Sequence, residues 1–391
     1  MALHDSAAAQ RLQAIREAMP ATTAHTYLNT GTFGPLPRCV IEAMQERLQE
    51  EWREGRLGAG AHAALLSHYR EARQRCAELL HADIEEIALT DNTGEGLNII
   101  AFGLNWREGD EVITTNHEHI SALAPLYQLR ERYGIRLRIA DLGERGERPA
   151  EEEIARLITP RTRLIVLSHV SFMTGARFDV SAVTALGRRH GLPVLVDGAQ
   201  AAGAIAVDVQ ELDVDFYAFP MQKWLCGPDG TGGLYVRRTA LGQVQSTYVG
   251  YYSLKHEHSG GWELQETAQR FELGGRQTAA LVGQSRALRW LAEEVGHHWL
   301  WERIASLNRY AAELLSEVPG VKILTPQPGA SGLLSFTFAQ AEPEAVVQRL
   351  AEEHNVLIRS IHERQALRLS TGFYNTEEEL ERVAEILRSW P

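Results

Sequence analysis

Short apolar runs alternate with amphipathic segments through the first two-thirds of the chain. The runs predict strands at Ile87–Thr90, Glu111–Thr115, Arg136–Asp141, Leu164–His169, Pro193–Asp197, Phe216–Phe219 and Gly233–Arg237. The segments before and between them predict helices at Arg38–Trp52, Ala63–Leu80, Glu95–Leu104, Ala122–Tyr133, Glu151–Ile158 and Ser181–His190. The predicted strand Leu164–His169 begins with four consecutive apolar residues, as buried parallel strands tend to do. This alternation predicts an α/β fold, with a parallel sheet covered by helices on both faces.

The pattern changes after about Gly275. Helices are expected at Ala279–Glu294, Trp301–Val318, Glu344–Glu353 and from Thr376, and strands at Lys322–Leu324, Leu333–Phe338, Val356–Arg359 and Ala366–Ser370. This second arrangement is of the α+β kind. We therefore predict an N-terminal arm or helix at 1–25, a large domain at 26–274 and a smaller C-terminal domain at 275–391.

Composition narrows the functional classes. Hydrophobic residues make up 44% and charged residues 23% of the chain, a balance typical of soluble globular proteins. No apolar run approaches the ~20 residues of a membrane span, and the start of the chain lacks the pattern of a secretory signal. The net charge of -12 argues against a nucleic-acid partner. Three widely spaced cysteines, Cys39, Cys76 and Cys226, suit a reducing cytoplasm and argue against a zinc site or a disulfide framework.

Candidate chemistry follows the predicted strands, because ligands of open α/β sheets bind at the carboxyl ends of strands. The strand Ile87–Thr90 leads into a polar, glycine-containing turn with Thr93 and Gly94, and then into a helix. Free N–H groups and the helix dipole favour a phosphate at such a turn. A plain helix cap with a tight turn explains the same residues.

A carboxylate and an amide follow the strand Pro193–Asp197. Asp197 ends an apolar strand, where a carboxylate is poorly hydrated unless it has a partner, and a pyridinium nitrogen is such a partner. Gln200 lies one short turn further on and could reach the same ligand. The alternative is a buried aspartate that caps the next helix.

A lysine and a histidine complete the set of candidates. Lys223 lies among apolar and aromatic residues, where partial burial would lower its pKa and make the neutral amine available for imine formation. A surface lysine beside a flexible loop is the alternative. His119 follows the strand Glu111–Thr115 and could stack on a flat ring. A metal site formed with His117 is weakly supported, because i,i+2 spacing without further ligands is poor evidence, and His117 also suits a structural role.

The order of these motifs, with Asp197-Gly198-Ala199-Gln200 and Lys223-Trp224, resembles the class V aminotransferase and cysteine desulfurase-like family of fold-type I pyridoxal 5'-phosphate (PLP) enzymes. The resemblance covers nearly the whole chain. It implies a large domain with a mostly parallel seven-stranded sheet, a smaller α+β domain, and a homodimer with shared active sites. It also implies a small amino-acid substrate.

The resemblance also assigns roles to individual residues. Lys223 would carry PLP as a Schiff base and act as acid and base, and Asp197 would pair with the pyridine nitrogen. His119 would stack on the ring and Gln200 would contact the ring oxygen. The phosphate would be held by Thr93 and Gly94, with Gln222 standing where many relatives have a phosphate-binding histidine. The remaining role falls to Arg368, which would bind the substrate carboxylate.

Within the family the chain is most similar to cysteine/cystine C–S lyases. Arg359 precedes Arg368 by nine residues, and two arginines suit a substrate with two carboxylates, such as cystine; an ordinary exposed charge is the alternative for Arg359. Besides Gln222, two departures bear on the cofactor contacts. Phe172 stands where desulfurases have an asparagine, and Gly275 lies where a threonine often reaches the partner's phosphate.

The choice of reaction depends on a missing cysteine. Desulfurases need a nucleophilic thiol shortly before the arginine strand, and the segment Arg359–Gln365 contains none. We therefore predict β-elimination on cystine, cysteine or a similar amino acid, giving pyruvate, ammonia and a sulfide or persulfide. An aminotransferase or epimerase is the alternative. A desulfurase is less favoured, and a non-catalytic PLP- or amino-acid-binding protein is the non-enzyme alternative.

Overall fold

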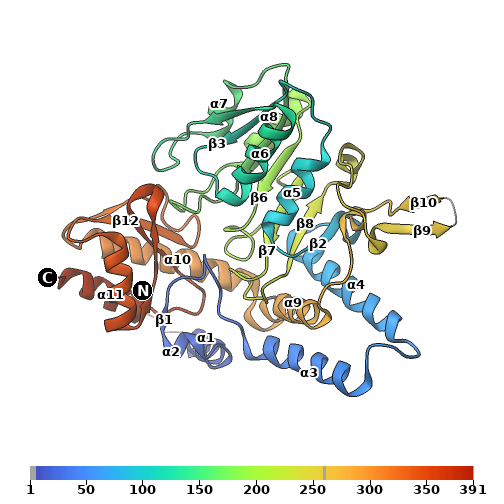
Figure 1. Ribbon diagram of the computed structural model, residues 1–391. Helices are drawn as coiled ribbons and strands as arrows, with labels where there is room; N and C mark the ends of the chain where they lie inside the picture. The colour runs from blue at the N-terminus through green and yellow to red at the C-terminus, as the bar shows by residue number, and fades with distance from the viewer. Residues whose placement is uncertain (1–5, 259–260, 391) are drawn as a thin grey trace.

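A computed structural model describes residues 6–258 and 261–390. Its main element is a seven-stranded sheet in the order β2-β8-β7-β6-β5-β3-β4 (Figure 1). The strands are β2 (Ile87–Thr90), β3 (Glu111–Thr115), β4 (Arg136–Ala140), β5 (Thr162–Ser168), β6 (Val194–Asp197), β7 (Phe216–Pro220) and β8 (Gly232–Val236). Only β8 runs antiparallel to its neighbours. The predicted α/β fold with a mostly parallel seven-stranded sheet is confirmed.

Helices bury both faces of this sheet. They are α4 (Ala61–Leu80), α5 (Thr93–Gly103), α6 (Ile120–Tyr133), α7 (Ala150–Ala155), α8 (Val180–His190) and α9 (Thr278–Trp290). A further helix, α3 (Arg38–Glu54), packs against α9 instead of the sheet. Side chains alternate along the strands, so Leu164 packs in the core with α5 and α6, whereas Ile165 packs in the core with α4, α8 and α9. Burial on both faces explains why the central strands β6 and β7 have nearly continuous apolar sequences.

The C-terminal segment forms a second, four-stranded antiparallel sheet. Its order is β11 (Val321–Ile323), β12 (Leu333–Phe338), β15 (Ala366–Ser370) and β14 (Arg359–Ile361). The helices α10 (His297–Ser316), α11 (Pro343–His354) and α12 (Glu377–Arg388) share a hydrophobic core with it. This part of the chain has the predicted α+β character, and the division into domains at 26–274 and 275–391 stays a prediction.

Several local details differ from the sequence prediction. The expected strand Val356–Arg359 is interrupted at Ile358: β13 (Val356–Leu357) pairs with β1 (Thr26–Tyr27), whereas β14 pairs with β15. The expected helix Ala279–Glu294 changes to a π-helical turn at Leu291–Val295. A hairpin of β9 (Leu254–His258) and β10 (Gly261–Leu264) projects from the body and was not predicted (Figure 1).

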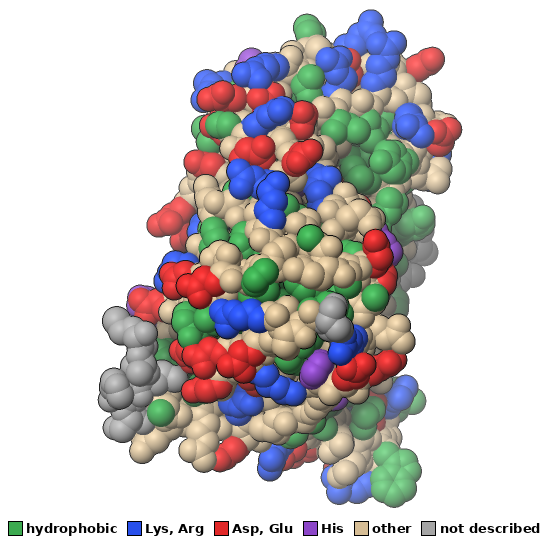
Figure 2. Space-filling view, turned by 90° about the vertical axis from the view of Figure 1, so that its left-hand side faces the viewer, with side chains coloured by type: hydrophobic (Ala, Val, Ile, Leu, Met, Phe, Trp, Pro, Cys, Tyr) green, Lys and Arg blue, Asp and Glu red, His purple; other side chains and the backbone are tan. Residues whose placement is uncertain are grey.

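The N-terminal arm forms α1 (Ser6–Ala18) and α2 (Ala21–Ala24), and the part of the predicted helix at 1–5 lies outside the described residues. On the face shown in Figure 2, acidic and basic side chains are interspersed, without a continuous basic area. Among the described helices, none has the length and apolar character needed to cross a bilayer.

Candidate active site

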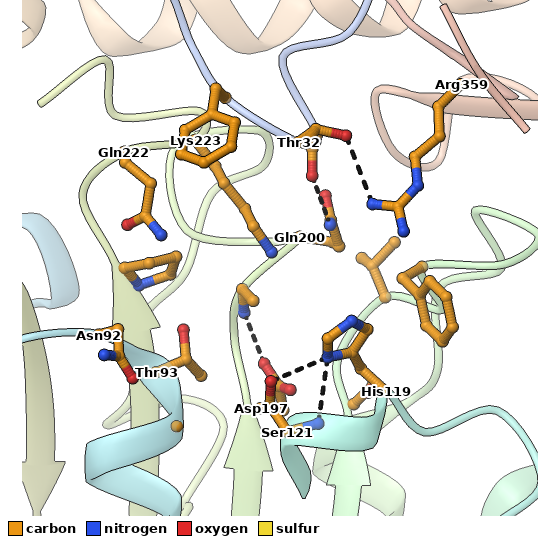
Figure 3. Close-up of a pocket in the computed structure, with 18 of the residues that line it drawn as sticks. Thr32, Asn92, Thr93, His119, Ser121, Asp197, Gln200, Gln222, Lys223 and Arg359 are labelled. Atoms are coloured by element: carbon orange, nitrogen blue, oxygen red, sulfur yellow. Dashed lines mark hydrogen bonds between the residues drawn. The ribbon is translucent and has the colours of Figure 1, made fainter. Parts of the chain in front are cut away.

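A cavity of about 360 Å³ lies at the carboxyl ends of β5, β6 and β7, next to the second sheet (Figure 3). All the site residues expected from the sequence line it, namely Thr93, Gly94, His119, Asp197, Gln200, Gln222, Lys223, Arg359 and Arg368. The structure therefore brings together residues that lie up to 275 positions apart in the chain (368 − 93).

Lys223 projects into the cavity from the loop that follows β7. The loop is held by main-chain contacts: the N–H of Cys226 donates to the Lys223 carbonyl (3.1 Å), and the N–H of Gly34 donates to the Gln222 carbonyl (2.7 Å). Burial lowers the pKa of Lys223 to about 8; Asp197 opposes this shift, and the cationic Arg368 and Arg359 add to it. The amine is therefore far more often neutral near pH 8 than that of an exposed lysine.

Asp197 and His119 lie on the other side of the cavity (Figure 3). The buried Asp197 carboxylate accepts a hydrogen bond from the Ala199 N–H (2.8 Å), and burial raises its pKa. His119 is the N-cap residue of α6, and its Nδ1 accepts the Ser121 N–H (3.2 Å). Burial and the charge of Lys223 lower the pKa of His119 to about 4, so its imidazole is neutral at pH 7.

The start of α5 and the loop after β7 each present an unpaired polar group to the cavity. The Asn92 side chain caps α5 by accepting the Glu95 N–H (3.0 Å). Within the described chain, the buried Thr93 hydroxyl and the Gln222 amide oxygen have no hydrogen-bond partner. A hydroxyl donor without a partner at a helix N-terminus fits a phosphate group, and the Gln222 amide can turn to offer its N–H groups.

Two arginines from the second sheet face the cavity. Arg359 on β14 lies opposite Arg368 on β15 in the antiparallel register. The buried Arg368 donates from Nη1 to the Phe172 carbonyl (2.8 Å) and from Nη2 to the Thr32 hydroxyl (3.3 Å), and Arg359 reaches the same hydroxyl (3.4 Å). In the described residues neither arginine pairs with a carboxylate. Burial and the neighbouring Arg359 lower the pKa of Arg368 to about 9. An anionic ligand would satisfy both guanidinium groups.

Three residues make contacts that the sequence did not indicate. Thr32 bridges the two arginines, and no motif marks it. Phe172 contributes its main-chain carbonyl to Arg368, and its ring contacts His119 edge-on at 4.9 Å. Gln200 lines the cavity, but its amide also joins two other segments, donating to the Gly31 carbonyl and accepting the Trp224 indole N–H, both at 2.9 Å.

His117 does not line the cavity. Its ring contacts the Ser171 hydroxyl (3.0 Å) and the Gly143 carbonyl (2.9 Å), which fits the structural alternative. No cluster of three potential metal ligands occurs in residues 6–258 and 261–390. None of the cysteines lines the cavity either, and burial raises the pKa of Cys76 to about 12.

The fold and this cavity together define an enzyme of fold-type I, the class that binds PLP at the strand ends of such a sheet. The chain belongs to the class V aminotransferase family, whose model matches residues 26–383. It is 30% identical to a probable cysteine desulfurase of Methanothermobacter thermautotrophicus, over 96% of this chain and 97% of that protein. It is 32% identical to the cysteine desulfurase CsdA of Escherichia coli, over 90% and 88% of the two chains.

Solved structures agree with this assignment. The cystine C–S lyase C-DES, in complex with its reaction product cysteine persulfide, superposes with a TM-score of 0.90 at 30% identity, covering 95% of this chain and 99% of that one. A C-DES mutant with glycine covalently linked to its PLP cofactor gives a TM-score of 0.91 at 30% identity, over 96% and 99%. The relatives are thus named for two reactions at a carbon–sulfur bond, and the curated names favour desulfuration more than the sequence prediction did.

Proposed function

We propose that this PLP-dependent enzyme, which acts on carbon–sulfur bonds, catalyses β-elimination on cystine or cysteine. Cystine and water would give pyruvate, ammonia and cysteine persulfide; cysteine and water would give pyruvate, ammonia and hydrogen sulfide. The observation that carries the proposal is the pair Arg359 and Arg368, which face the cavity without a carboxylate partner in the described residues. The named neighbours, a cystine lyase and cysteine desulfurases, support the same substrate class.

The cavity residues fit PLP. The unpaired Thr93 hydroxyl and the start of α5 suit its phosphate, and the buried Asp197 carboxylate suits a protonated ring nitrogen. The neutral, flat imidazole of His119 suits the ring face. When bound, PLP supplies an electron sink for the electron pair left at Cα after a proton is removed. Lys223 would hold the cofactor covalently and then, once released, take the Cα proton on Nζ.

The arginines would bind and orient the substrate. Apart from Lys223, which would hold the cofactor, the cavity is lined by two cationic side chains, Arg359 and Arg368, and by one carboxylate, Asp197, which suits the cofactor ring. A substrate that brings one or two carboxylates balances this excess. Arg368 is fixed by Phe172 and Thr32, so it suits the α-carboxylate next to the reacting carbon. Arg359, which is only half-buried, suits the second carboxylate of cystine.

The cysteines favour elimination over desulfuration. Desulfuration needs a thiolate that attacks the substrate sulfur. Cys76 and Cys226 are buried outside the cavity wall, and burial raises the pKa of both thiols. Elimination needs no protein thiol. The names of the curated relatives support desulfuration as the second candidate, with a thiol supplied from elsewhere.

The test is to incubate the purified, PLP-loaded protein with cystine or cysteine, without a keto-acid acceptor, and to quantify pyruvate and alanine. Elimination produces pyruvate, whereas desulfuration produces alanine. A variant with Cys39, Cys76 and Cys226 all changed to serine should retain pyruvate formation, and Lys223→Ala should lose it. Alanine as the main product, or loss of turnover in a folded cysteine-free variant, would contradict elimination. The homodimer with shared active sites stays a prediction, which sedimentation can check.

A further inference from the structure

Two carboxylates flank the turn that we assign to the phosphate. Asp91 precedes Asn92-Thr93-Gly94 and Glu95 follows it. Asn92 and Gly94 line both the cavity and a second groove on the outer side of the turn, whereas Asp91 and Glu95 line the outer groove but not the cavity. Negative charges next to a dianion site weaken phosphate binding, and Glu95 also lies in the first turn of α5, where it reduces the pull of the helix dipole on the ligand.

One arginine contacts both carboxylates. Arg276 pairs with Asp91 through Nη1, and its Nη2 lies 3.4 Å from Glu95. Nη2 also donates to the Leu89 carbonyl on β2 at 2.8 Å. The Glu95 carboxylate in turn accepts the Asp91 N–H. The guanidinium therefore joins the end of β2, the turn and the first turn of α5.

The backbone holds Arg276 in this place. Gly274 and Gly275 precede it with φ values of 98° and 74°, a left-handed conformation that side chains disfavour. The Arg276 N–H donates to the Tyr69 hydroxyl on α4 (3.0 Å), and the side chain is only 10% exposed. Arg276 does not line the cavity, so it cannot contact a ligand there directly.

We propose that Arg276 is a positioning residue for the cofactor phosphate. It compensates the charges of Asp91 and Glu95 and holds both carboxylates on the outer side of the turn, which leaves the inner side to the phosphate at Thr93 and Gly94. The inference rests on the proposed function, because it requires PLP at this turn. Arg276 directly follows Gly275, the position where relatives often have a threonine.

The test compares PLP with pyridoxal, which lacks the phosphate. Dissociation constants for both aldehydes are measured on the apoprotein from the absorbance of the lysine-bound form. Arg276→Gln should weaken PLP binding roughly tenfold, the effect of one lost charge near a dianion at intermediate dielectric, and should change pyridoxal binding much less. Arg276→Lys keeps the charge and should retain most of the preference for PLP. Added salt should reduce the difference between Arg276→Gln and the wild type.

Two further variants separate charge from folding. Asp91→Asn in the Arg276→Gln background should restore part of the lost PLP affinity. The matched control is Arg238→Gln, which removes an arginine that also pairs with two carboxylates, Asp83 and Glu85. None of these three residues lines the cavity. Arg238→Gln should change neither the affinity for PLP nor the affinity for pyridoxal. If Arg276→Gln does not fold, Asp91→Asn alone should tighten PLP relative to pyridoxal, because Arg276 then has one carboxylate fewer to compensate.

The outcomes are distinguishable. An equal loss for PLP and pyridoxal, or no loss for either, would overturn the role of Arg276 and leave the proposed function in place, as long as the wild type binds PLP. Weaker or unchanged PLP binding in Asp91→Asn would also overturn it. A wild-type protein that binds no PLP would overturn the proposed function, and this inference with it.

Discussion

The lowered pKa of Lys223 makes a quantitative prediction about how the apoprotein captures PLP. Only the neutral amine forms a bond to the aldehyde. With a pKa of about 8 instead of 10.5, the neutral fraction at pH 7.5 is about 0.24 instead of about 0.001, a gain of roughly 200-fold. We expect the capture rate, followed by stopped-flow absorbance after mixing with PLP, to rise with pH and level off above about pH 8.5.

The neighbours of Lys223 give this prediction its controls. Asp197 raises the pKa of Lys223 and Arg359 lowers it, so Asp197→Asn should move the midpoint to lower pH and Arg359→Ala should move it to higher pH. His119 is neutral throughout this range and adds no titration of its own. A capture rate that rises about ninefold between pH 8.5 and pH 9.5 would refute the reasoning, because it would mean that Lys223 titrates like an exposed lysine.

Three further predictions concern the arginine pair, the loop that carries Lys223, and a buried ion pair between Glu272 and Arg73 on α4. Arg359→Ala should lower kcat/KM for cystine by about 10- to 100-fold, the worth of a charge-assisted hydrogen bond, but should affect a substrate with one carboxylate much less; equal losses on both substrates would contradict the second-carboxylate role. Gly34→Ala should reduce PLP affinity in equilibrium titration, since a Cβ there would lie 2.0 Å from the Lys223 carbonyl. Glu272→Gln should lower the free energy of unfolding in urea by about 3–5 kcal/mol, because it leaves the buried Arg73 without its partner at 2.9 Å; a loss below about 1 kcal/mol would contradict this.

The sequence predicts the seven-stranded sheet well for a physical reason. Strands buried on both faces, such as β5, have continuous apolar sequences that are easy to recognise. The hairpin β9–β10 lacks this signal, because Lys255-His256-Glu257 is polar throughout. The break at Ile358 is also invisible, since both halves of the run are extended and only their partners differ.

The residues of the candidate site also differ in how well the sequence predicts them. Residues that follow strands, such as Asp197 and Lys223, could be found because fold topology places strand ends together. Thr32 could not be found, because it comes from an irregular segment that approaches the arginines only in three dimensions. The link from Arg368 to Phe172 uses a main-chain carbonyl, which any residue provides, so no side-chain pattern records it.

The residues suited to PLP and the two arginines belong to different sheets. The residues suited to PLP come from loops at the strand ends of the seven-stranded sheet, whereas both arginines lie on adjacent strands of the four-stranded sheet. If the arginines bind the substrate as proposed, mutations in β14 and β15 would alter which amino acid is accepted more than they would alter the direct contacts to the cofactor. An enzyme built in this way can acquire a new substrate in evolution without passing through a form that has lost its chemistry.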